Sequence, residues 1–154
     1  MALFYADSSV LVKRHVVEPG SLWVEDLFDL DLGHEVITSR LSTIEVVSAL
    51  NRRVRAESIA ATDCRQLRDD FLSLCRHTYQ LVQVTNPVLA RARLLLERHA
   101  LRAYDGLHLA SALLANDQLM ASSAPALTFL AADTRLLAAA TAEGLPVDNP
   151  NNYP

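Results

Sequence analysis

The sequence predicts an α/β protein in which a mostly parallel sheet is covered by helices on both faces. Short apolar runs that suit strands alternate along the chain with longer segments whose apolar residues recur at helical spacing. Strands that alternate with helices in this way are typical of parallel sheets. At 154 residues, and with no stretch that resembles a linker, the chain fits one domain with a core of its own.

The beginning of the chain predicts two strands with helices between them. Residues 3–6 form a short apolar strand, and after Asp7 the chain turns into a helix. Residues 18–20, Glu-Pro-Gly, are typical of a turn, and Ser21 can cap a helix that extends to about Phe28. Val36 and Ile37 then predict the second strand.

Two amphipathic helices are predicted in the middle of the chain. Ser42 opens the first, whose apolar face is predicted to carry Ile44, Val47, Leu50 and Val54. The second runs from Thr62 to about His77 and carries Cys64 and Cys75 on its apolar face. Because no C-x-x-C or zinc pattern surrounds these cysteines, we interpret them as buried, reduced thiols.

The last part of the chain predicts three strands, at residues 81–84, 127–130 and 145–147. Asn86-Pro87 is a cap followed by a first-turn proline, which starts a helix. Asp105 opens a strongly apolar helix that reaches Leu114, and a final helix follows Asp133 until Gly144 stops it.

Composition and charge are those of a soluble globular protein. Apolar residues make up 51% of the chain and charged residues 21%, and the net charge is −4. The apolar runs are too short to span a membrane and the N-terminus lacks the pattern of a secretion signal, so we expect a cytoplasmic protein. Residues 1–149 are predicted to form the single domain, and residues 150–154 a loose tail.

Four carboxylates stand at chemically suggestive positions: Asp7, Glu45, Asp105 and Asp133. Asp7 and Asp133 follow the carboxyl ends of predicted strands, where open α/β sheets bind their ligands. Glu45 and Asp105 lie at the beginnings of apolar helices. If those helices pack on the sheet near the same edge, the four side chains converge.

Each acid also has a purely structural interpretation, which stays open at this point. Asp7, Asp105 and Asp133 are all suitable helix N-caps. Ser42-x-x-Glu45 matches a capping box, in which the glutamate folds back onto the cap residue. These roles are compatible with function, because a helix N-terminus keeps a carboxylate ionised.

Convergence of the four acids would favour metal binding. Two carboxylates about 4 Å apart repel by roughly 4 kcal/mol at an effective dielectric constant near 20. A pocket that gathers them either raises their pKa values or recruits a cation. Oxygen-only ligands favour Mg²⁺ or Mn²⁺, and such an ion can activate water for attack on a phosphodiester. A phosphodiester hydrolase is therefore the function that these residues favour.

Other catalytic chemistries find no motif in the chain. No H-E-x-x-H, G-x-S-x-G, P-loop or G-x-G-x-x-G pattern occurs. His108 lies three residues after Asp105, on the same predicted helix face. We expect it to be a hydrogen-bonded packing residue behind the site, with a direct catalytic role as the alternative.

Four segments of the chain form recognisable motifs: F-Y-A-D-S-S-V-L-V-K-R with E-P-G following, S-x-x-x-x-x-E-V-V-S-A-L-N-R from Ser39 to Arg52, L-R-A-Y-D-G-L-H-L-A-S-A-L, and F-L-A-A-D-T-R-L-L-A-A-A followed by G-L-P-V. Each of these segments resembles the PIN-domain toxins of the VapC type. They occur in the order found in that family and span nearly the whole chain. One departure is the stretch 116–125, which looks longer or less regular than the family's link to its last strand.

The resemblance implies a PIN-like three-layer α/β/α sandwich and a metal-dependent endoribonuclease, the toxin of a type II toxin–antitoxin pair. Asp7, Glu45 and Asp105 correspond to the family's acids that bind Mg²⁺ or Mn²⁺, and Asp133 to the fourth. Ser9 or Ser8 is then expected to assist beside the metal. The family also implies an RNA substrate such as tRNA or rRNA, a homodimer, and a VapB-type antitoxin as partner. The alternative function is a catalytically silent PIN-like module for protein interaction.

Overall fold

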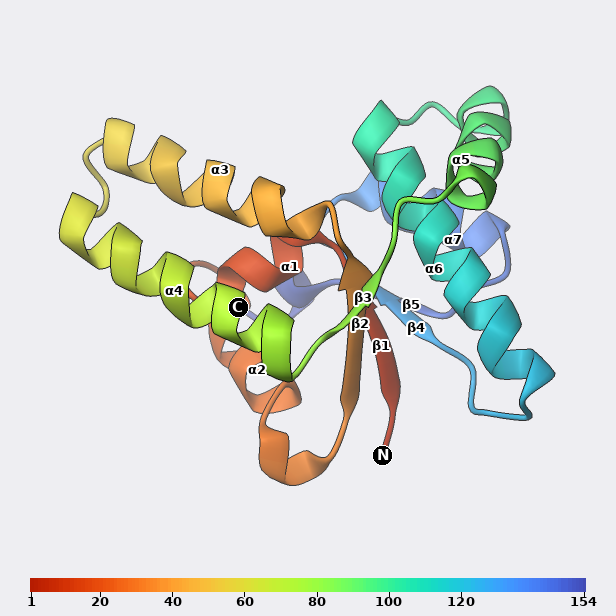
Figure 1. Ribbon diagram of the computed structural model, residues 1–154, viewed down its shortest axis with the longest axis horizontal. Helices are drawn as coiled ribbons and strands as arrows, with labels where there is room; N and C mark the ends of the chain where they lie inside the picture. Colours follow the sequence, from red (N-terminus) through yellow and green to blue (C-terminus); the bar gives the residue numbers. More distant parts are fainter.

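The computed structural model describes residues 1–154 as a parallel sheet between two layers of helices (Figure 1). The strands are β1 (Leu3–Ala6), β2 (Glu35–Ser39), β3 (Gln80–Val82), β4 (Thr128–Leu130) and β5 (Val147–Asp148). Their order across the sheet is β3-β2-β1-β4-β5. The helices are α1 (Ser8–Lys13), α2 (Ser21–Leu27), α3 (Ser42–Arg55), α4 (Ala61–His77), α5 (Asn86–Arg98), α6 (Ala103–Ala121) and α7 (Thr134–Ala142). All strand pairs are parallel, which confirms the predicted α/β class.

The central strand β1 belongs to both cores of the molecule. Successive side chains of a strand point to opposite faces of its sheet. Leu3 and Tyr5 accordingly enter a cluster of 18 buried residues, whereas Ala6 enters a second cluster of 15. Because β1 pairs with β2 on one side and β4 on the other, it holds the two layers in register.

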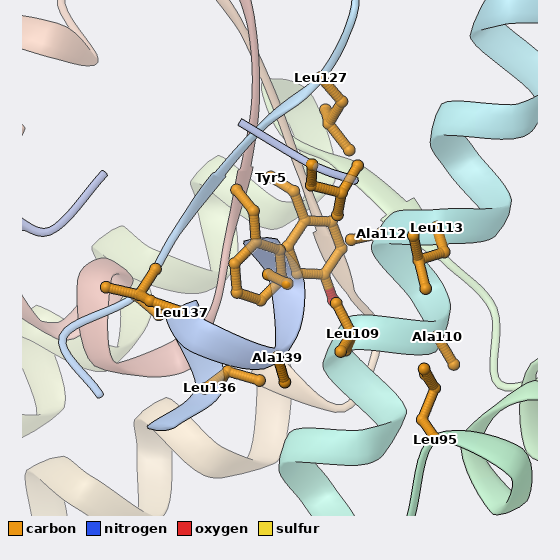
Figure 2. Close-up of a cluster of buried hydrophobic side chains, with 14 of the residues drawn as sticks. Tyr5, Leu95, Leu109, Ala110, Ala112, Leu113, Leu127, Leu136, Leu137 and Ala139 are labelled. Atoms are coloured by element: carbon orange, nitrogen blue, oxygen red, sulfur yellow. The ribbon is translucent and has the colours of Figure 1, made fainter. Parts of the chain in front are cut away.

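The helices divide between the two faces of the sheet. The first cluster is built with α5, α6 and α7, and Figure 2 shows Tyr5 of β1 among leucine and alanine side chains of α6 and α7. The second cluster is built with α1, α2, α3 and α4, which lie on the other side of the sheet in Figure 1. Neither layer could bury its apolar face without the sheet.

The buried face of α3 differs from the predicted one. Leu50 is buried as expected, but Ile44 is 61% exposed and Val47 is only partly buried. The residues that face the core are instead Ser42, Val46, Ala49 and Leu50. Small side chains make up half of this face and carry little hydropathy, so helical periodicity in the apolar residues does not reveal it.

Two helix boundaries also differ from the sequence prediction. The stretch 116–125 is not an irregular link over its whole length, because α6 continues through Asn116 to Ala121. Thr85, rather than Asn86, caps α5, and the oxygen of its hydroxyl accepts a hydrogen bond from the backbone N–H of Val88. Pro87 lies in the first turn, as predicted.

The last residues of the chain, expected to form a loose tail, make defined contacts. Asn149 caps a short 3₁₀ helix, Pro150–Asn152, and is buried together with Pro150. Tyr153 stacks on Trp23 of α2, with ring centroids 4.5 Å apart and an interplanar angle of 2°. An aromatic pair and a cap give this segment an anchor that its composition does not suggest.

The carbonyl of Pro150 also explains a glycine. Gly20 has φ +87°, and a Cβ at this position would lie 2.4 Å from the carbonyl oxygen of Pro150. Gly20 is thus required both for the turn before α2 and for the approach of the C-terminal segment. As a separate finding, no helix combines the length and apolar character needed to cross a membrane.

Candidate active site

The four acids named from the sequence lie around the carboxyl ends of β1 and β4. Asp7 directly follows β1, and Asp133 precedes α7 a few residues after β4. Glu45 and Asp105 lie in the first turns of α3 and α6, one from each helical layer. The charges of Asp133 and Glu45 both act to raise the pKa of Asp105, so the acids share one electrostatic environment.

Asp7 is a buried carboxylate that caps α1. It is 5% exposed, and its Oδ1 accepts hydrogen bonds from the backbone N–H of Val10 at 3.2 Å and from the hydroxyl of Ser9 at 2.5 Å. Burial, and to a smaller extent the carboxylate of Asp105, raise the pKa of Asp7 to about 6 against the opposing effects of His108 and the two hydrogen bonds. The cap predicted for Asp7 is confirmed.

Ser9 connects the ends of the two central strands. Besides donating to Asp7, its Oγ accepts a hydrogen bond from the backbone N–H of Ala132 at 3.1 Å. The beginning of α1 is thereby tied to the segment that leads from β4 to Asp133. Ser8 lines the adjacent cavity.

Glu45 is held by His108 and not by a capping box. The Nε2 of His108 lies 2.6 Å from Oε1 of Glu45, and its Nδ1 lies 2.9 Å from the hydroxyl of Tyr5. The predicted capping box is wrong because the Ser42 hydroxyl instead bonds Thr38 at 2.7 Å. His108 is 1% exposed, so its burial and hydrogen bonds agree with the packing role expected behind the site.

Tyr5 is a residue that inspection of the sequence missed. The signal was available, since a tyrosine in a fully buried strand requires a hydrogen-bond partner for its hydroxyl. Tyr5 is 0% exposed and lies two residues before Asp7. Its partner comes from a helix about a hundred residues away in sequence and could not be identified without the fold.

Asp105 and Asp133 face a shared cavity of about 270 Å³, which Arg102 and Arg135 also line. Asp133 caps α7, as predicted, by accepting from the backbone N–H groups of Arg135 at 2.8 Å and Leu136 at 3.3 Å. The cap predicted for Asp105 is wrong, because α6 begins earlier with Arg102 at the cap position. Partial burial and then the charge of Asp133 raise the pKa of Asp105.

A second cavity, of about 500 Å³, adjoins Glu45. One part of its lining is polar and contains Ser8, Ser9 and Glu45. Another part is basic and contains Lys13, Arg52 and Arg53. Glu18 neutralises part of this basic side, since it accepts from Lys13 at 3.3 Å and from Arg53 at 2.8 Å. Exposed arginine here suits contact with phosphate.

The acids are gathered but do not enclose a ligand. No three His, Cys, Asp or Glu side chains come together in a group that could hold a metal ion. Glu45 opens to the larger cavity, whereas Asp105 and Asp133 open to the smaller one. The arrangement offers a set of oxygen donors at the carboxyl ends of the strands, with Asp7 buried directly after β1.

This fold and this edge define a protein of the PIN-domain class. The PIN domain family model matches residues 4–140. The chain therefore belongs to the PIN-domain family, and within it to the VapC group, as its relatives show. It is 33% identical over 148 residues to Ribonuclease VapC45 and to Ribonuclease VapC49, each from a strain of Mycobacterium tuberculosis. Each alignment covers 96% of this chain and 95% of the relative.

Solved structures share the fold at low sequence identity. A toxin–antitoxin complex from Klebsiella pneumoniae contains a chain that superposes with a TM-score of 0.64 at 16% identity, covering 96% of this chain and 97% of that one. A chain of VapBC2 from Rickettsia felis, bound to a DNA fragment from their promoter, gives 0.60 at 10% identity, covering 96% and 98%. These likenesses confirm the α/β/α sandwich.

Proposed function

We propose that this protein is a metal-dependent endoribonuclease and the toxin of a type II toxin–antitoxin pair. The observation that carries the proposal is the gathering of Asp7, Glu45, Asp105 and Asp133 at the carboxyl edge of the sheet. Its support comes from the raised pKa values of Asp7 and Asp105, which reflect burial and mutual repulsion. The names of its ribonuclease relatives agree with this chemistry.

The donor set fits a hard divalent cation. PIN-domain ribonucleases generally depend on a divalent metal ion, and all four candidate ligands here are carboxylates, which favour Mg²⁺ or Mn²⁺ over zinc. Mg²⁺ usually keeps several of its waters and needs few direct protein ligands. An open group of acids that does not enclose an ion by itself suits such a partly hydrated cation.

The chain's own residues divide the work between holding the cation and placing the RNA. A bound ion of this kind supplies an activated water and neutralises charge on the phosphodiester. Asp7, Glu45 and Asp105 would hold the ion, and Asp133 would supplement them or orient the attacking water. Ser9 keeps one oxygen of Asp7 in place. The basic side of the larger cavity, with Arg52 and Arg53, receives the phosphates next to the one that is cut.

The partners follow from the same relatives and neighbours. We assign the substrate to RNA, with tRNA or rRNA as the class, and the place of action to the cytoplasm. Two neighbours in fold come from toxin–antitoxin assemblies, which supports a VapB-type antitoxin as the neutralising partner. We assign a homodimer on the family resemblance.

The decisive test compares the protein with its Asp7→Asn variant on total tRNA and on a short single-stranded RNA, with Mg²⁺, with Mn²⁺ and with EDTA. Asparagine can still accept the bonds that cap α1, so the variant is expected to fold. Discrete fragments that require metal and disappear in the variant are the expected result. Equal cutting by both proteins would show that the activity is a contaminant.

A metal titration separates the enzyme from a catalytically silent PIN-like module. A ligand that binds only the folded state raises its melting temperature. The enzyme is expected to show such a rise with Mn²⁺, and the Asp7→Asn variant a smaller one. Absence of any rise in the protein, together with absence of RNA cleavage, would favour the silent module.

A further inference from the structure

We propose that Tyr5 and His108 form a buried positioning unit that sets the orientation of the Glu45 carboxylate. The unit joins three elements, because Tyr5 lies on β1, His108 on α6 and Glu45 on α3. This inference rests on the proposed function, in which Glu45 is one of the metal-binding acids. Neither residue contacts the RNA or the cation in this assignment, so both act through Glu45.

Tyr5 is the fixed end of the unit. Its ring is fully buried, and it stacks on Phe129 of the neighbouring strand with centroids 5.4 Å apart and an interplanar angle of 5°. Figure 2 shows the ring inside the apolar cluster next to α6. A side chain clamped in this way has no rotameric freedom, so its hydroxyl is a stationary partner for the Nδ1 of His108.

The two hydrogen bonds of His108 are compatible with a single proton arrangement when the imidazole is neutral. The carboxylate of Glu45 can only accept, so the 2.6 Å contact between its Oε1 and Nε2 of His108 places the imidazole proton on Nε2. Nδ1 is then an acceptor, and the hydroxyl of Tyr5, 2.9 Å away, donates to it. Tyr5 thus selects the tautomer of His108 that can hold a carboxylate.

His108 also links Glu45 to a second acid of the site. It lies three residues after Asp105 and therefore on the same side of α6. Any movement of the imidazole would change the position of the Glu45 carboxylate relative to that of Asp105, although the two acids come from opposite helical layers. Groups that orient metal ligands in this way typically contribute about 10- to 100-fold in metal affinity or activity.

Four variants test the unit, with the intact protein as reference. Tyr5→Phe removes only the hydroxyl that selects the tautomer. His108→Gln places an amide donor near the position of Nε2, whereas His108→Asn places its polar atoms near Nδ1 and leaves Glu45 without a donor. Tyr79→Phe is the matched control, since Tyr79 is another buried tyrosine but its hydroxyl has no partner.

We expect Mn²⁺ affinity, measured by calorimetry, to fall by about 10- to 100-fold in His108→Asn and by a smaller factor in Tyr5→Phe. His108→Gln should retain more affinity than His108→Asn, and Tyr79→Phe should match the intact protein. RNA cleavage should follow the same order. Equal losses in the two His108 variants, or an unchanged affinity in His108→Asn, would overturn the proposal and leave the ribonuclease assignment intact.

A second measurement needs neither metal nor RNA. The ¹⁵N chemical shifts of the imidazole report which nitrogen of neutral His108 carries the proton. The intact metal-free protein is expected to hold it on Nε2, and Tyr5→Phe is expected to show a mixture of tautomers. A proton on Nδ1 of His108 in the intact protein would refute the positioning unit even if the protein cleaves RNA as proposed.

Discussion

Ser9 and Asp7 are joined by a hydrogen bond of 2.5 Å, from the serine hydroxyl to Oδ1 of the aspartate. The same serine oxygen accepts the backbone N–H of Ala132, which lies 123 residues further along the chain. One hydroxyl therefore holds the acid that follows β1 and fastens the segment after β4. The local geometry of the site and the connection between the segments that follow β1 and β4 depend on the same atom.

Ser9→Ala is expected to weaken both functions of this hydroxyl. The variant removes the acceptor of the partly buried backbone N–H of Ala132, and a hydrogen bond of this kind typically contributes about 0.5–1.5 kcal/mol to the free energy of unfolding. Cleavage of RNA should fall as well, because Asp7 loses a bond to its Oδ1. Urea denaturation and a Mn²⁺-dependent cleavage assay provide the measurements. Ser122→Ala is the control, since Ser122 is exposed and its hydroxyl donates only to the carbonyl of Gln118, and equal effects of both variants would argue against the role of Ser9.

Asp105→Asn is expected to reduce cleavage by more than about 100-fold without destabilising the metal-free protein. Burial, and then the neighbouring acids, raise the pKa of Asp105, so removal of its charge relieves both desolvation and repulsion in the absence of a cation. Asp117→Asn, on the same helix, removes an exposed carboxylate that pairs with Arg91 and should retain full activity. Thermal melting without metal and initial cleavage rates test both variants. A loss of stability in Asp105→Asn would contradict the repulsion.

His15 is expected to make the protein less stable as the pH falls. Burial, and then the charge of Arg14, lower its pKa from 6.5 to about 4, while Asp70 opposes the change. Below pH 6.5 His15 is therefore mostly protonated in the unfolded chain, whereas in the folded protein it stays mostly neutral down to about pH 4. The contribution of His15 to the free energy of unfolding is therefore fully present above pH 6.5 and falls progressively toward pH 4. The expected loss at pH 5 is about 1–2 kcal/mol.

The contribution of His15 can be separated from that of Asp7, which has the opposite sign. The raised pKa of Asp7 stabilises the fold as the pH falls through 6. The comparison is therefore between the protein and His15→Leu, each unfolded in urea at pH 7.5 and pH 5. The difference in unfolding free energy between the two proteins should shift in favour of His15→Leu at pH 5. An equal difference at both pH values would show that His15 titrates normally.

Tyr153→Ala is expected to free the C-terminal segment. Tyr153 stacks on Trp23, and its hydroxyl donates to Asp148 at 3.0 Å. An aromatic pair typically contributes about 0.5–1.5 kcal/mol beyond its buried area, so a comparable loss in unfolding free energy should follow. Because Trp23 is the one tryptophan of the chain, its fluorescence spectrum reports the change directly. Tyr104→Ala, which removes an exposed tyrosine on α6, should leave that spectrum unchanged.

The sequence predicts elements that depend on local patterns, and these agree with the structure. Strand β1 is an apolar run followed by a capping aspartate, and α7 begins directly after its cap Asp133 and ends before Gly144, as its residues indicate. Both signals lie within a few residues, so they are visible before the chain is folded. A shared site for the four acids could likewise be predicted, because two of them follow strands.

What the sequence could not predict depends on contacts between distant segments or on how far a helix is rotated. The bond between His108 and Glu45 spans 63 residues, and that between Tyr5 and His108 spans 103. The buried face of α3 includes Ser42 and Ala49, whose low hydropathy conceals their orientation. Periodicity in one segment contains no information about which side chain of another segment it meets.

The pairing of β1 with β4 has a consequence for the order of events during synthesis. Phe4, Tyr5 and Ala6 of β1 pair with Thr128, Phe129 and Leu130 of β4. The residues of β4 are therefore synthesised more than a hundred residues after those of β1. Until then the end of β4 is missing beside Asp7, Ser9 has no bond to Ala132, and Asp133 has not yet been made. A nascent chain therefore lacks the complete acidic edge, and the site comes into existence only after β4 and Asp133 have been made and β4 has paired with β1.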